Sequence, residues 1–150
     1  MIESVAGSPS NARTLEIGAR LDELARLRSF VRTSCAELGA ADDCIVDLVQ
    51  AVDEAATNIV THGYLGSAGR IGVTIDAAAD RVWVVISDRA PSFDPTSVVE
   101  PDLASSHLRP GGMGVHLMRA ATDVMTHQGR PGGGNVLTLV RTLGSRDEEE

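Results

Sequence analysis

The chain has 150 residues, and its 43% hydrophobic content is enough for one well-buried core. Its formal net charge of -8 would repel a nucleic-acid backbone or an anionic membrane, which argues against both as the main direct partner. The longest apolar run, residues 82–86, is far shorter than the roughly 20 residues of a membrane-spanning helix. The first residues lack the apolar segment of a secretion signal, so we expect a cytoplasmic protein.

The two ends of the chain differ in composition from the rest. Residues 1–12 are rich in Ser, Gly, Pro and Asn, and residues 143–150 end in a run of acids, which predicts two flexible ends. One domain is expected between them, over residues 13–142. Cys35 and Cys44 have neither CxxC spacing nor a nearby ligand cluster, so they are expected to be free, structural thiols.

The first half of the domain predicts one strand and two helices. Residues 13–18 alternate apolar and polar side chains, as an edge strand does. Apolar residues then recur at helical spacing over residues 21–38, and Gly39 provides a natural stop. The second helix is expected over residues 42–62, with Asp42 as its cap.

The second half predicts four strands and one more helix. In chain order these are strands at 70–76 and 81–87, a helix at 112–121, and strands at 123–127 and 136–142. Consecutive strands form hairpins, and helices grouped apart from them suggest one sheet covered on one face. The expected fold class is α/β: a two-layer sandwich of a mixed β-sheet with helices on one face. Since only 3% of residues are aromatic, Trp83 is expected to be a packing residue.

The second predicted helix carries a carboxylate and a carboxamide one turn apart. Glu54 and Asn58 lie on the same side, because residues four apart are neighbours on a helix. The apolar stripe lies on the opposite face. It consists of Ile45, Leu48, Val49, Val52, Ala55, Ala56, Ile59 and Val60. Without other signals, such a polar pair indicates only a solvated helix face.

Two later segments are suited to binding a ligand. Asp88 follows a predicted strand, where a buried carboxylate needs a specific partner; the alternative is a turn that Asp88 caps itself. Gly111, Gly112, Met113 and Gly114 precede a helix whose unpaired N–H groups can contact phosphate oxygens. The alternative for this segment is a flexible loop that ends in a helix.

Together, the segments DEAATNIVTHGY, SDRAPSFDP and RPGGMGVHLMRAATDVM resemble the three ATP-binding boxes of the GHKL superfamily in order and spacing. The likeness covers about residues 13–142, and it is nearest to the stand-alone anti-sigma factors with serine/threonine kinase activity. It implies the Bergerat ATP-binding fold, with ATP and Mg²⁺ as cofactors. By the same resemblance, Glu54 is the catalytic general base, Asn58 ligates Mg²⁺, and Asp88 accepts the exocyclic amine of adenine.

The resemblance also assigns the remaining nucleotide contacts. They are Ala90, Phe93, Arg109, Gly111, Gly112, Met113, Gly114 and Val115. The long loop over residues 96–110 resembles the ATP lid of the superfamily. Arg109 within this loop is either a phosphate contact or a solvated arginine.

Two positions depart from the superfamily pattern. Ala90 replaces the first glycine of the DxGxG motif, which is unfavourable if the backbone there needs a positive φ angle. The usual glycine–threonine pair near the last strand reads Gly134–Asn135 here. Asn135 could replace the threonine as a hydrogen-bonding group, and Thr138 could simply alternate on the strand, so this contact stays unassigned.

The resemblance implies a kinase that sequesters a sigma factor and phosphorylates an anti-sigma factor antagonist of the STAS type, with a possible homodimer. The two departures motivate an alternative: a kinase-inactive, nucleotide-dependent protein-binding module of the same fold. A metabolic or DNA-linked ATPase of the superfamily fits less well, because the chain is short and has no transducer domain. The four histidines lack the spacing of a metal site, and Rossmann and P-loop motifs are absent.

Overall fold

The computed structural model describes residues 12–91, 94, 96 and 112–145. Their helices and strands are β1 (Arg13–Gly18), η1 (Leu21–Glu23), α1 (Leu24–Glu37), α2 (Asp42–Asn58), η2 (Ile59–Gly63), β2 (Arg70–Ala78), β3 (Arg81–Asp88), α3 (Gly112–Ala121), β4 (Val124–Gly129) and β5 (Asn135–Thr142). Each strand and helix predicted from the sequence is present, with ends shifted by a few residues at most. None of the described helices combines the length and low polarity that crossing a lipid bilayer requires.

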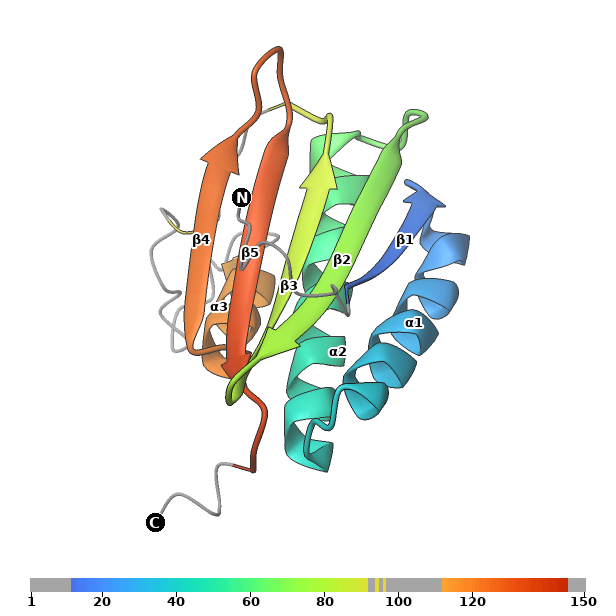
Figure 1. Cartoon of the computed structure of the whole chain (residues 1–150). Coiled ribbons are helices and arrows are strands. Elements are labelled where there is room, and N and C mark those ends of the chain that lie inside the picture. Colours follow the sequence, from blue (N-terminus) through green and yellow to red (C-terminus); the bar gives the residue numbers. More distant parts are fainter. Residues whose placement is uncertain (1–11, 92–93, 95, 97–111, 146–150) are drawn as a thin grey trace.

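The strands form one five-stranded sheet in the order β1-β2-β3-β5-β4 (Figure 1). The α/β two-layer class is confirmed, but the sheet that we expected to be mixed is antiparallel at every described pairing. The pairing of β3 with β5 joins segments separated by α3 and β4, so hairpin reasoning from the sequence did not give its direction.

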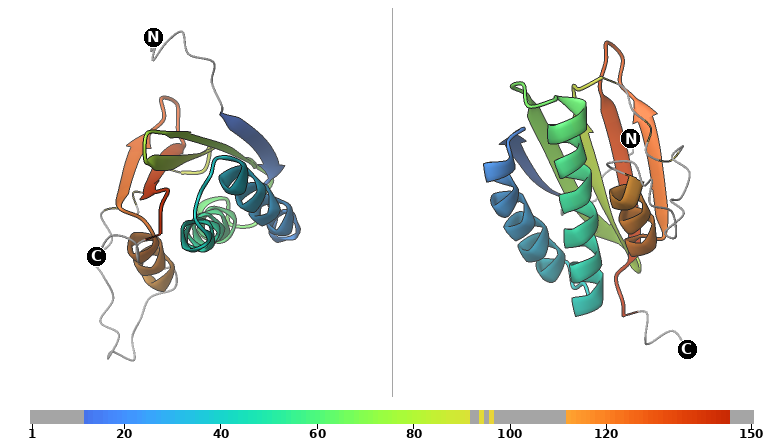
Figure 2. Two further views of the ribbon diagram at one scale, coloured as in Figure 1. Left: turned by 60° about the horizontal axis from the view of Figure 1, so that its bottom comes forward. Right: turned by 180° about the vertical axis from the view of Figure 1, so that it is seen from behind.

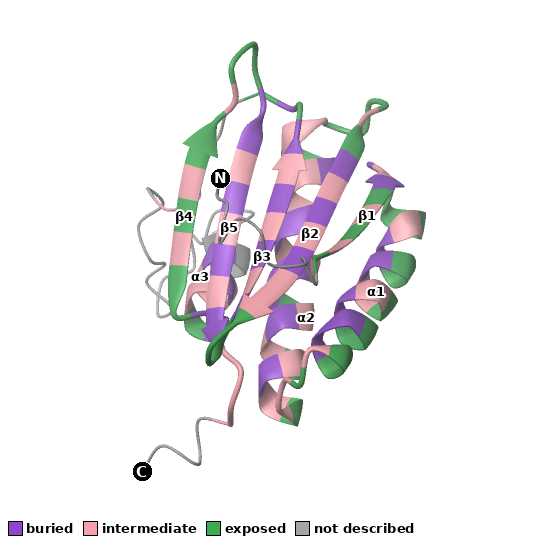
Figure 3. Cartoon of the chain, viewed as in Figure 1, coloured by how far each residue is buried: buried purple, intermediate pink, exposed green. Residues whose placement is uncertain are grey.

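Three helices cover one face of this sheet, and α2 lies in the middle between α1 and α3 (Figures 1 and 2). Buried and half-buried residues alternate along the central strands (Figure 3), because successive side chains of a strand point to opposite faces. The side chain of Trp83 alternates with buried Val82 and Val84 and is half-buried on the face away from the helices. Trp83 is therefore not part of the main core between the sheet and the helices.

The two ends of α2 differ from the sequence prediction. Ala41 is the N-cap residue, so Asp42 is the first residue inside the helix and favours it through the helix dipole instead of capping it. At the other end, the chain continues past Asn58 as the π-helical turn η2. The Tyr64 N–H donates to the Ile59 carbonyl, five residues earlier, at 2.7 Å. Such turns occur frequently at functional sites.

A buried arginine ties β5 to the beginning of α2. The Arg141 side chain is 0% exposed, and its Nε donates to Asp47 Oδ2 at 3.0 Å. The Arg141 Nη2 lies 3.7 Å from Asp43 Oδ2, and Nη1 donates to the carbonyls of Thr142 and Gly144. The buried charge is tolerated because these oxygens surround it.

Candidate functional site

Glu54 and Asn58 occupy neighbouring turns at the C-terminal half of α2 and are both half-buried. Neither side chain makes a hydrogen bond or ion pair within the described part of the chain. Two polar side chains that are partly withdrawn from water, yet keep their hydrogen-bonding groups available, are suited to binding a ligand.

Ion pairs on two sides of α2 add to the core packing that fixes the rotation of this helix about its axis. Asp53 accepts a hydrogen bond from Arg28 of α1, with Nη1 and Oδ1 2.8 Å apart. Asp47 lies two turns before Glu54 and therefore on the same side, and it pairs with the buried Arg141 of β5. The flank of α2 that carries Glu54 is thus held in place relative to the sheet.

Asp88 ends β3 with a buried carboxylate that is engaged at one oxygen. Its Oδ1 accepts the Ala90 N–H at 2.9 Å and the Asn135 Nδ2–H at 2.9 Å. The Asp88 side chain therefore caps its own turn, as the alternative interpretation held. Within the described residues, both hydrogen bonds to the carboxylate end on Oδ1, so Oδ2 keeps its capacity to accept one from a ligand.

Ala90 connects this turn to the end of the second helix. Among the residues that the structure describes, positive φ angles outside glycine occur at Leu65 and Ala79, so Ala90 does not need glycine's conformational freedom. A Cβ built on Gly63 would lie 3.0 Å from the Ala90 Cβ. The absence of a side chain at Gly63 thus makes room for the methyl group of Ala90.

Tyr64 makes a second connection between the same two segments. Its hydroxyl accepts the Arg89 N–H at 2.8 Å and donates to the Arg70 carbonyl at 2.9 Å. The chain that follows Asn58 is therefore fixed against the chain that follows Asp88. The structure brings the first two predicted ligand-binding segments together at one end of the sheet.

Sequence reasoning left Asn135 unassigned and gave His127 no role, yet both belong to this site. Asn135 is buried directly across the sheet from Asp88. His127 Nε2 lies 2.8 Å from Asn135 Oδ1. Thr138 is half-buried on the opposite face of β5, because the buried residues of that strand are the odd-numbered ones. Only the three-dimensional register reveals that Asn135, and not Thr138, contacts the Asp88 carboxylate.

The glycine-rich segment is placed in part. The first turn of α3 consists of Gly112, Met113 and Gly114. This helix packs against α2 and is antiparallel to it (Figure 1). Val115 is 2% exposed and belongs to the core, so its contribution to a ligand site would come from its backbone. Three more predicted contacts lie outside the described residues: Phe93, Arg109 and Gly111.

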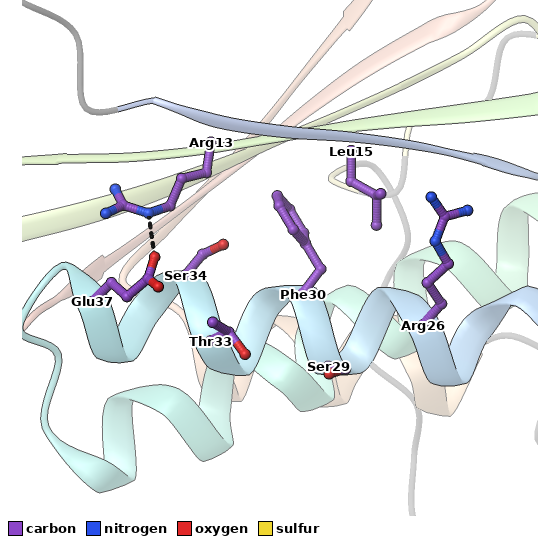
Figure 4. Close-up of a pocket in the computed structure, with 8 residues that line it drawn as sticks. All are labelled: Arg13, Leu15, Arg26, Ser29, Phe30, Thr33, Ser34 and Glu37. Atoms are coloured by element: carbon purple, nitrogen blue, oxygen red, sulfur yellow. Dashed lines mark hydrogen bonds and ion pairs between the residues drawn. The ribbon is translucent and has the colours of Figure 1, made fainter.

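A separate groove of about 500 Å³ lies between β1 and α1 (Figure 4). Its lining includes Arg13, Leu15, Phe30 and Glu37. None of the residues predicted to bind nucleotide contributes to it. This groove is therefore distinct from the site formed by α2, β3 and β5.

Comparison with known proteins places these features in a family. Residues 17–141 match the family described as histidine kinase-like ATPase domain. Serine-protein kinase RsbW of Staphylococcus aureus is 31% identical over 126 residues, which cover 79% of this chain and 79% of that protein. Serine/threonine-protein kinase BtrW of Bordetella bronchiseptica is 37% identical over 95 residues, covering 61% of this chain and 66% of that protein.

A solved structure shows the same fold. The crystal structure of the RsbU and RsbW domains of Rv1364c from Mycobacterium tuberculosis matches 92% of this chain, with a TM-score of 0.64 and 25% sequence identity. This chain spans 33% of that longer protein. Because the family match covers most of the chain, and serine kinases recur among its relatives, the resemblance read from the sequence is confirmed. The chain belongs to the histidine kinase-like ATPase domain family, and serine-protein kinases named RsbW are among its relatives.

Proposed function

We propose that this domain is a cytoplasmic serine/threonine kinase that uses ATP and Mg²⁺, phosphorylates an anti-sigma factor antagonist of the STAS type, and sequesters a sigma factor. A possible homodimer, which the sequence resemblance implies, is part of this proposal. The observation that carries the proposal is the position of Asp88: a buried carboxylate with one engaged oxygen, next to the chain that follows Glu54 and Asn58. The serine-protein kinase relatives support the reaction class.

The described residues fit a magnesium-bound adenine nucleotide. An exocyclic amine is a hydrogen-bond donor, and Asp88 Oδ2 is an acceptor to which no described residue donates. The Asn58 side chain offers an uncharged oxygen, and Mg²⁺ commonly takes one or two protein oxygens together with nucleotide phosphates. The first turn of α3 adds backbone N–H groups that are suited to phosphate oxygens.

The geometry suggests how these residues would divide the chemistry. Glu54 would accept the proton of the substrate hydroxyl while the hydroxyl oxygen forms a bond to the γ-phosphorus. The bond between the γ-phosphorus and the oxygen that bridges to the β-phosphate would break, which releases ADP. Asn58 would hold the Mg²⁺, and the backbone N–H groups at the N-terminus of α3 would hold the phosphates in place for this in-line transfer. Bound Mg²⁺ would offset the negative charge of the triphosphate.

Isothermal titration with Mg-ATP tests the binding part of this proposal. Wild-type protein should give saturable heat, and Asp88→Asn should weaken binding about tenfold or more, because one carboxylate oxygen becomes an amide donor facing an amine donor. Asn58→Ala should weaken binding mainly when Mg²⁺ is present. Asp22→Asn, at a highly exposed position in η1, is the matched control and should bind like wild type. Absence of saturable heat from the folded wild type would refute the proposal.

The kinase-inactive binding module remains the second candidate. Its motivation was the pair of departures at Ala90 and at the last strand. The structure accommodates Ala90 without left-handed backbone and gives Asn135 a hydrogen bond to Asp88. Saturable ATP binding without phosphate transfer to any STAS-type antagonist would favour this second function.

A further inference from the structure

Asn135 holds the turn that contains Asp88 with both hydrogens of its amide. Its Nδ2 donates to Asp88 Oδ1 at 2.9 Å and to the Pro91 carbonyl at 3.2 Å. A carboxylate and a carbonyl can only accept, so the amide nitrogen must face them. The amide oxygen of Asn135 therefore points the other way, toward β4.

This orientation determines which nitrogen of His127 carries a proton. Asn135 Oδ1 can only accept, and it lies 2.8 Å from His127 Nε2, so Nε2 must be the donor. The His127 side chain is 8% exposed, which shields this hydrogen bond from competing water. Its other nitrogen, Nδ1, faces the Asp94 carboxylate at 3.7 Å.

The far end of this chain of contacts is itself anchored. Asp94 Oδ1 accepts the Thr96 backbone N–H at 2.8 Å and the Thr96 hydroxyl at 2.5 Å. The hydroxyl contact is the main reason that the pKa of Asp94 is lowered. The Thr96 carbonyl accepts from Arg119 of α3 at 2.7 Å. One row of hydrogen bonds and polar contacts thus joins β3, β5, β4 and α3.

We propose that Asn135 and His127 are positioning residues. They orient Asp88 toward the nucleobase and thereby set the preference for a nucleotide whose base carries an exocyclic amine. This inference rests on the proposed function, because it assigns the base specificity of the same site. Asn135 and Ala90 together occupy Oδ1 of Asp88, and His127 keeps the Asn135 amide from rotating. A flipped amide would present an oxygen to the carboxylate, which would repel it and turn Asp88 away from its ligand-facing orientation.

Titrations with Mg-ATP and Mg-ITP test this assignment, because inosine carries a carbonyl oxygen in place of the amine of adenine. Wild type should bind ATP at least about tenfold more tightly than ITP. His127→Leu removes the donor to Asn135 and should reduce the ATP to ITP ratio about fivefold or more. His127→Gln places an N–H near the position of Nε2 and should restore the ratio to within about twofold. Thr138→Val, on the opposite face of β5, is the matched control and should keep the wild-type ratio.

The outcomes separate this inference from the proposed function. If wild type binds neither nucleotide, the proposed function fails, and this inference fails with it. If wild type selects ATP but the folded His127→Leu variant keeps the full ratio, the positioning role is wrong and ATP binding stands. Nitrogen NMR of the histidine rings gives a second test on unsubstituted protein: neutral His127 should carry its proton on Nε2, and a proton on Nδ1 alone would overturn the assignment.

Discussion

Gly63 and Ala90 face each other across the junction between η2 and β3, and a Cβ on Gly63 would lie 3.0 Å from the Ala90 Cβ. This distance is shorter than nearly all Cβ contacts in proteins. The relationship explains why glycine precedes Tyr64 in this chain, and why alanine is acceptable two residues after Asp88. The two positions are coupled, and each limits the size of the other.

Gly63→Ala should therefore displace the turn after Asp88. We expect ATP binding to weaken about fivefold or more, because overpacking shifts the backbone that orients the carboxylate. Adding Ala90→Gly should restore binding, since the second change removes the opposing methyl group. Titration of Mg-ATP into the two single variants and the double variant measures this coupling.

Gly18→Ala is the control for this pair, because a Cβ at Gly18 meets nothing within 4 Å and its φ angle is not positive. It should bind ATP like wild type. Equal binding by Gly63→Ala and Gly18→Ala would show that the Gly63 contact with Ala90 does not matter to the site.

The buried pair between Arg141 and Asp47 makes a strong prediction about stability. Asp47→Ala leaves the guanidinium, 0% exposed, without its nearest carboxylate and should lower the free energy of unfolding by about 3 kcal/mol. Glu16→Ala removes the partner of Arg70 in an exposed pair and should cost less than about 1 kcal/mol. Urea denaturation of the two variants measures both changes in the free energy of unfolding. Equal losses would contradict the role of the buried Arg141 in joining β5 to α2.

The two helix cysteines predict how stability depends on alkaline pH. Burial raises the pKa of Cys35 from 9.0 to about 12, and the neighbouring Cys44 thiol adds a smaller increase. Burial is also the main reason that the pKa of Cys44 rises to about 11. Above pH 9 the unfolded chain loses thiol protons that the folded chain keeps. Stability that is fully present below pH 9 should therefore fall as pH rises toward the folded pKa values.

Cys35→Ala should remove part of this pH dependence. We expect wild type to lose about 1 kcal/mol more than the variant between pH 8 and pH 10, because the Cys35 thiol is the more deeply desolvated of the two. Urea denaturation of both proteins at pH 8 and pH 10 measures this difference in the free energy of unfolding. Parallel losses in the two proteins would mean that the Cys35 thiol titrates normally in the fold.

Periodicity predicted the strands and helices well because their buried faces dominate the local pattern. The apolar stripe of α2 and the alternation in β2 and β3 reflect one-sided burial, which a sequence records directly. The π-helical turn after Asn58 left no such pattern. Its i to i+5 hydrogen bond depends on how Tyr64 is held against β2 and β3.

The candidate site was only partly predictable, for a physical reason. Glu54, Asn58 and Asp88 could be predicted as candidates because the motifs that contain them are continuous segments. Contacts that join distant segments gave no local signal: Asn135 meets Asp88 through strand register alone. Arg141 is charged at a position where alternation predicts an apolar residue, and its partner is 94 residues away in sequence.

The central claim is that Glu54 is the general base of an ATP-dependent phosphate transfer. Its most direct test compares wild type with Glu54→Gln, using radiolabelled ATP and a STAS-type antagonist protein as acceptor. We predict that wild type transfers label to a serine or threonine of the acceptor, while Glu54→Gln lowers the transfer rate by about 100-fold or more and still binds Mg-ATP with nearly unchanged affinity. Undiminished transfer by Glu54→Gln would contradict the account.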